Sequence, residues 1–194
     1  MDPLEFKQHW DAGGTPTVPS ADEVLGILDL SSATVDFLRI AGLPGSAAPW
    51  LVFSDNSYCV RLTQLYPFLP EEYGNFISLG CDGEGNPIVV DTLDDDSILW
   101  VDHEDGFAPR YMNTSIHALA VFLLAYRDFV RGLIEKKGDE AFLNCDFTDE
   151  ELVVMKRTMN ETDAMALEKG HFWNSEIQTL LANRAHYGQG LREG

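Results

Sequence analysis

The sequence predicts an α+β fold: an antiparallel sheet of five to six strands, with N-terminal helices and with C-terminal helices packed on one face. Three short apolar runs at 76–80, 87–91 and 98–102, rich in β-branched or aromatic residues, are typical of buried strands. Connections as short as those between them can join only antiparallel neighbours. An apolar stripe with three/four spacing follows at 116–133, and it predicts a long amphipathic helix that covers the sheet.

The predicted strands are separated by turns. Segments 81–86 and 92–97 contain the Gly, Asn and Asp residues that tolerate turn geometry. Upstream, the apolar segments 50–53 and 58–62 flank the polar segment 54–57, a pattern that predicts a hairpin. Together these segments give about five antiparallel strands.

Capping signals predict the helices that precede the sheet. Asp2 before Pro3 is typical of a helix start, and the Gly-, Thr- and Pro-rich segment 11–19 then predicts a linker. Ser20 begins the capping box Ser-Ala-Asp-Glu, which predicts a second helix. A third helix is expected to end at Gly42, because glycine adopts the left-handed conformation of a helix C-terminus readily.

Similar signals predict the C-terminal helices. After a loop expected at 103–110, the long helix is expected to be capped by Asn113 or Thr114. Thr148 begins the capping box Thr-Asp-Glu-Glu of another helix, and an apolar face at 173–182 predicts the last one.

The length of 194 residues is sufficient for one domain with a sizeable core. We expect residues 1–19 to form an N-terminal helix and linker, and residues 20–188 to form a single α+β domain. The polar, Gly-containing tail at 189–194 is expected to be frayed.

The formal net charge of −19 is the outstanding compositional feature. A nucleic acid or an anionic membrane surface would repel such a chain, so we expect neither as a partner. The charge favours a basic protein partner or, equally simply, serves solubility. Residues 62–109 contain eleven Asp or Glu and no Lys or Arg. Most of these acids lie in the predicted turns, so one end of the sheet is expected to be strongly negative.

Other sequence features argue against a membrane, a metal and a cofactor. The apolar stretches are too short to span a bilayer and the N-terminus lacks the regions of a signal peptide, so we expect a cytoplasmic protein. The three cysteines have no paired spacing typical of a disulfide scaffold or a zinc site. The turn at 82–86 resembles a calcium loop, but Pro and Leu occupy the positions that need Gly and a bidentate Glu. We therefore expect no cofactor.

The order of the central motifs resembles a known family. A strand ending in Gly80, the acidic Gly-rich turn 82–86 and two further strands precede the Asn-Thr-Ser helix start at 113–115. This order is similar to that of the SUKH (Smi/Knr-like) superfamily of bacterial immunity proteins and yeast cell-wall regulators, and is closest to its fourth described family. The similarity begins in the helix at Asp36 and continues to the C-terminal segment with Phe-Trp and Glu176, so that it covers about 36–181.

The resemblance implies a non-catalytic immunity protein that binds and neutralises a cognate bacterial toxin, such as a nuclease or a deaminase, by occluding its active site. A regulatory protein-binding adaptor, as in the yeast members, is the alternative. A metal-dependent hydrolase is less favoured, because the sequence contains no G-x-S-x-G, H-E-x-x-H or Walker motif.

We expect the partner to bind at the acidic turns, because a basic toxin surface would be steered toward them. Successive turns of a meander lie at opposite ends, so 82–86 and 103–105 are expected to share one end and 94–96 to lie at the other. The exposed aromatic residues around Tyr66, Phe68 and Tyr73 are the second choice of surface. The candidate partner-binding residues are Asp82, Glu84, Asp94, Asp95, Asp96, His103, Glu104 and Asp105.

Overall fold

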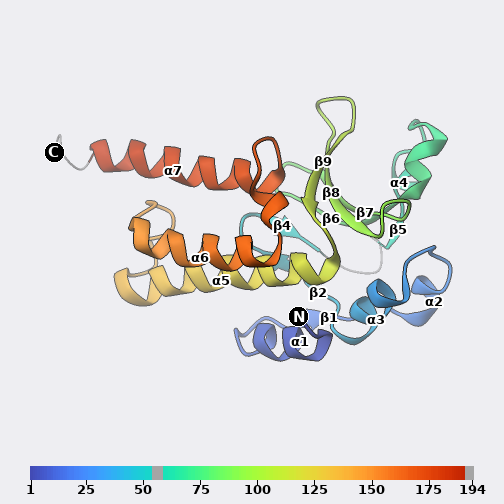
Figure 1. The fold of residues 1–194 in the computed structure, drawn as a ribbon, viewed down its shortest axis with the longest axis horizontal. Helices are drawn as coiled ribbons and strands as arrows, with labels where there is room; N and C mark the ends of the chain where they lie inside the picture. The colour runs from blue at the N-terminus through green and yellow to red at the C-terminus, as the bar shows by residue number, and fades with distance from the viewer. Residues whose placement is uncertain (54–58, 191–194) are drawn as a thin grey trace.

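The apolar stripe predicted after the meander forms helix α5 (Ile116–Lys137) in the computed structural model, which describes residues 1–53 and 59–190. This helix contacts α1 (Pro3–Asp11), α3 (Ser32–Ile40) and α6 (Asp149–Thr162), and it packs on the last two strands of the sheet. Figure 1 shows α1, α2 and α3 on one side of α5, with α6 and α7 (Phe172–Gly190) on the other. The predicted α+β fold is confirmed.

The predicted meander is present as strands β6 (Phe76–Cys81), β7 (Pro87–Asp91) and β8 (Ser97–Asp102), paired antiparallel in this order. Strand β9 (Ala108–Asn113) then pairs with β8, where the sequence predicted a loop. The predicted loop holds for 103–107 and was wrong for 108–110, where Pro109 and the exposed Arg110 hide the strand pattern. Since β9 lies at the edge of the sheet, it tolerates a proline.

The hairpin predicted for 50–62 is also wrong. Strands β4 (Leu51–Val52) and β5 (Val60–Arg61) both pair antiparallel with β6, on the edge that β7 leaves open. They therefore run in the same direction and cannot pair with each other as a hairpin; the turn predicted at 54–57 lies outside the described residues. A side chain at Gly80 would collide with the carbonyl oxygen of Val52, so the glycine of the β6 motif allows β4 to approach.

Very short strands account for the remaining pairing, and none of them was predicted. Strand β3 (Ser46–Ala47) pairs with β4 and lengthens the main sheet, whose order is β3-β4-β6-β7-β8-β9. Strands β1 (Thr17–Val18) and β2 (Leu43–Pro44) form a separate two-stranded sheet. The segment 11–19 is thus more than a linker, because half of this small sheet comes from it.

Both faces of the main sheet are apolar. Ile88 and Val90 of β7 belong to the main core with α5, which also takes in Phe6 and Trp10 of α1. Val89 points to the opposite face, as the twofold period of a strand requires. There it joins a smaller cluster that is covered by α4 (Leu62–Leu65), the 3₁₀ helix η1 (Glu71–Asn75) and the residues between them.

Two predicted helix caps differ in the structure, whereas Asp2 and Thr148 cap as the sequence patterns indicate. Helix α2 (Asp22–Leu25) begins after Ala21, and the hydroxyl of Ser20 instead lies 3.5 Å from the sulfur of Cys59. Helix α5 is capped by Ser115, whose Oγ accepts a hydrogen bond from the backbone N–H of Ala118, and not by Asn113 or Thr114.

Buried polar groups engage Asn113 and Thr114 just before α5. Asp163 Oδ2 accepts hydrogen bonds from the backbone N–H of Thr114 at 2.7 Å and from the Tyr111 hydroxyl at 3.0 Å. Asn113 Oδ1 accepts one from the indole N–H of the fully buried Trp173 at 2.9 Å. These bonds join the corner between β9 and α5 to the 3₁₀ helix η2 (Ala164–Leu167) and to α7.

The packing of α5 on the core can be tested at Leu123, because the side chain of this residue is completely buried. We expect Leu123→Ala to lower the free energy of unfolding by about 2–5 kcal/mol, since the cavity it leaves cannot fully collapse. Chemical denaturation measures this loss. The control Val153→Ala, at an exposed site on α6, should change stability by less than about 0.5 kcal/mol.

Asp163→Ala tests the polar corner. The substitution removes the buried acceptor of Thr114 N–H and Tyr111 O–H, and each hydrogen bond to a charged group contributes about 1.5–3 kcal/mol. We therefore expect a loss of roughly 2 kcal/mol or more in chemical denaturation. Glu161→Ala, two residues away and exposed, is the control; equal effects of both substitutions would contradict the structural role of Asp163.

Candidate functional site

Two acidic turns meet at one end of the sheet. Asn86, at the end of the β6–β7 turn, accepts on Oδ1 a hydrogen bond from the backbone N–H of His103 at 3.1 Å and one from its ring Nδ1 at 2.6 Å. The side chain of Asn86 is buried. Its two hydrogen bonds to His103 clamp the β6–β7 turn to the β8–β9 turn. As expected, 82–86 and 103–105 share an end; we call the exposed part of these two turns the acidic end.

Asp82 holds the shape of the first turn. Its Oδ1 accepts from the backbone N–H groups of Glu84 and Asn86, each at 2.9 Å. Its Oδ2 accepts from the Asn86 side-chain amide at 2.9 Å and from the indole N–H of Trp100 at 2.7 Å. The carboxylate is thus occupied by four donors, and its role is to fix the turn.

The outward acids of this end are Glu84, Glu104 and Asp105, all exposed. Arg110 of β9 lies among them and reaches across the hairpin to Asp102 at 2.9 Å and to Asp105 at 3.7 Å. The sequence did not predict this cation at the acidic end. Antiparallel pairing of 102 with 108 explains the approach. Glu84 and Glu104 make no ion pair with any residue that the structure describes.

A further carboxylate reaches this end from α7. Burial, together with the nearby charges of Asp82 and Glu84, raises the pKa of Glu176 to about 7. In the sequence, Glu176 was singled out only as part of the C-terminal motif, and its place at the acidic end was not predicted. Its position beside the β6–β7 turn follows from Phe172, whose ring packs 6.1 Å from that of Trp100.

The third acidic turn lies at the opposite end of the strands, between β7 and β8. Asp94 and Asp95 are exposed there. Asp96 is only 4% exposed, and its Oδ2 accepts from the backbone N–H of Ser31, the N-cap residue of α3, at 2.8 Å. Its carboxylate is therefore used inside the chain.

The comparison with known families adds a decisive observation. The model of the SUKH-4 immunity protein family matches residues 2–180. The chain belongs to this family. The resemblance seen in the motifs around Gly80 and at 113–115 is thereby confirmed, and with it an immunity role. No curated protein and no solved structure matches the chain.

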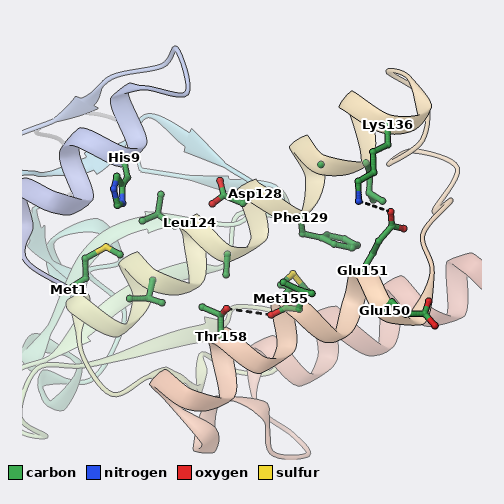
Figure 2. Close-up of a pocket in the computed structure, with 15 residues that line it drawn as sticks. Met1, His9, Leu124, Asp128, Phe129, Lys136, Glu150, Glu151, Met155 and Thr158 are labelled. Carbon is green, nitrogen blue, oxygen red and sulfur yellow. Dashed lines mark hydrogen bonds and ion pairs between the residues drawn. The ribbon is translucent and has the colours of Figure 1, made fainter.

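The SUKH-4 chain also has a groove away from the acidic end, about 580 Å³ in volume, which runs along α5 between α1 and α6 (Figure 2). Leu124 and Phe129 of α5 and Met155 of α6 line it. Its rim carries charges of both signs, since Lys136 pairs with Glu151 at 3.4 Å. The charge of the groove therefore does not select a class of partner.

The aromatic residues considered as the second choice lie on the sheet face opposite α5. The rings of Tyr66 and Phe68 pack around Phe107 at 4.9 and 5.6 Å, and the hydroxyl of Tyr73 donates to the carbonyl of Phe107. Phe68 is nevertheless 73% exposed, so this cluster presents one free aromatic face.

In the described part of the chain, no group of three or more His, Cys, Asp or Glu side chains is arranged to hold a metal ion. No helix there is both long and apolar enough to cross a membrane. What the described residues offer at the acidic end is a rigid, negatively charged surface, which is suited to binding a cationic surface.

The raised pKa of Glu176 predicts a pH-dependent stability. Between its ordinary value of 4.5 and about 7, the folded chain holds this proton more tightly than the unfolded chain does. The contribution to stability is therefore complete below pH 4.5 and is lost as the pH rises through 7. We expect Glu176→Gln to be more stable than the wild type by about 1–3 kcal/mol at pH 8, with little difference at pH 4.

Thermal unfolding across this pH range measures the effect. Glu168→Gln, at an exposed position, is the control and should follow the wild type at every pH. A Glu176→Gln curve parallel to that of the wild type would show that the carboxylate stays ionised in the folded chain.

Proposed function

We propose that this SUKH-4 protein neutralises its cognate toxin by binding it through the acidic end, without catalysing a reaction. One observation carries the proposal: Glu84, Glu104 and Asp105 are exposed together on two turns that Asn86 clamps to each other. The family supplies the immunity role. The charge supports a class of toxin, because an enzyme that acts on nucleic acid presents a basic surface to phosphates.

Electrostatic attraction supports this mode of binding. A chain with a net charge of −19 attracts a basic surface, and the attraction extends over a Debye length of ~8 Å at physiological salt. Such steering mainly accelerates association. A nuclease or a nucleic-acid deaminase would then exchange its substrate for the acidic turns, which compete for the same cationic groups.

The rigidity of the turn also supports binding. Four hydrogen bonds to Asp82 and two to Asn86 Oδ1 hold the backbone that carries Glu84 and His103. A preorganised surface loses less conformational entropy on association than a flexible loop does. The toxin would therefore meet a formed surface.

Charge reversal tests the proposal. We expect the combined substitutions Glu84→Lys, Glu104→Lys and Asp105→Lys to slow association by roughly tenfold or more at low salt and to weaken its salt dependence, because charges at a rim act chiefly on the association rate. Stopped-flow mixing measures the rate, with a catalytically inactive form of the cognate toxin domain as the partner. Stability should change little, since these side chains are exposed.

The matched control reverses three exposed acids near the other end of the sheet, with Glu72→Lys, Asp94→Lys and Asp95→Lys. The two triple variants have the same total charge. Equal rates for the two would show that only net charge matters and that the acidic end is not the site. Failure of the wild-type chain to protect cells that express the active toxin would contradict the function itself.

A further inference from the structure

An exposed tryptophan lies next to the acidic end. Trp50 is 74% exposed, whereas Trp10 and Trp173 are buried and Trp100 is half-buried. It stands in the short hairpin in which Ala47 of β3 pairs with Leu51 of β4, and its φ of 61° is a conformation that a bulky side chain rarely adopts. Such positions cluster at functional sites, where the surrounding structure holds the strained conformation in place.

The tryptophan and the acidic turn form one continuous surface. A side chain at Gly83 would lie 3.2 Å from Cβ of Trp50, so the turn rests directly against this residue. Both residues line a depression of about 630 Å³, together with Leu143, which is 63% exposed, and Phe142. An apolar centre is therefore bordered on one side by the backbone that carries Glu84.

The charged residues that line this depression are both paired with acids outside it, which leaves Glu84 at its border as the unpaired charge. Two cations line it, and both are already paired: Arg127 Nη2 lies 2.7 Å from Asp128, and Arg131 lies 3.6 Å from Glu135. Arg127 also donates to the carbonyl of His9. Glu84, by contrast, makes no ion pair within the part of the chain that the structure describes. The unpaired charge at the border of the depression is thus negative, and it complements a cationic partner.

We propose that Trp50 is the anchor of the toxin-binding surface, and that it receives a cationic side chain of the basic toxin together with the apolar surface around it. The inference rests on the proposed function and deepens it by locating the centre of the interface. Tryptophan is the residue most typical of interface hot spots, and its ring attracts a cation most strongly. The acidic turn supplies the charged rim, and the depression supplies the contact that excludes water.

A second copy of the chain fits this surface less well than a basic partner does. A symmetric dimer through Trp50 would place the same patch of both subunits face to face. Glu84 would then oppose the acidic turn of the other copy without a cation to compensate it. Like charges at such an interface weaken association.

Affinity measurements test the anchor. We expect Trp50→Ala to raise the Kd for the inactive cognate toxin domain by about 30-fold or more, as for a hot-spot residue. Trp50→Phe should recover part of the affinity. Phe68→Ala is the matched control, because Phe68 is equally exposed but lies on the opposite face of the sheet; its Kd should stay within about twofold of the wild type. Melting temperatures of the variants verify that each remains folded.

Fluorescence provides an independent readout. Trp50 is the exposed one of the four tryptophans, so acrylamide quenching of the free protein reports mainly on its ring. The difference in quenching between the wild type and Trp50→Phe isolates this signal even when the toxin contains tryptophans. Saturation with the toxin domain should abolish the difference, because the ring becomes covered.

The outcomes separate this inference from the function on which it rests. Protection by both the wild type and Trp50→Ala, with equal Kd values, would overturn the anchor and leave the immunity function standing. Loss of affinity in Phe68→Ala instead would place the interface on the opposite face. A wild-type chain that neither binds nor protects would overturn both. Sedimentation that shows a dimer abolished by Trp50→Ala would make a second copy the occupant and overturn the inference.

Discussion

The burial of α5 is the constraint on which the rest of the fold depends. Its buried positions include the consecutive residues 118–120 and 122–124, so its apolar surface extends around more than one face. A helix of this kind needs cover from several directions. The sheet supplies one, α1 and α3 supply a second and α6 supplies a third, which is why segments from both ends of the chain converge on it. A strip of α5 along the groove in Figure 2 stays open.

Covering α5 also determines the electrostatics of the acidic end. Trp173 of α7 is fully buried against Phe122 and Tyr126 of α5, with ring centroids 5.3 and 6.2 Å apart. The preceding residue, Phe172, then packs on Trp100. This seating brings Glu176, one turn further along α7, beside the β6–β7 turn, where Asp82 and Glu84 raise its pKa. Apolar packing thus adds a carboxylate to a surface that is already acidic.

Polar groups inside the fold serve to join elements. Asp163, Asn113 and Asp82 each accept hydrogen bonds from segments distant in sequence, so their oxygens are used inside the chain. Asp96 does the same for the start of α3. The outward acids Glu84 and Glu104 have no such structural role, because other residues maintain the geometry of the turns on which they lie. The division between structural and available carboxylates follows from burial and from the donors within reach.

The sequence by itself determined the features that arise from local signals. These features depend on residues close to one another, so the sequence alone reveals them. They are the helical period of 116–133, the caps Asp2 and Thr148, and the turns at 81–86 and 92–97. The alternation of turns in a meander also placed 82–86 with 103–105 correctly. Tertiary structure decided everything that depends on partners distant in sequence. It paired β4 and β5 with β6 and made β9 an edge strand. It also placed Trp50 against Gly83, because contact between segments thirty residues apart depends on how the whole core packs.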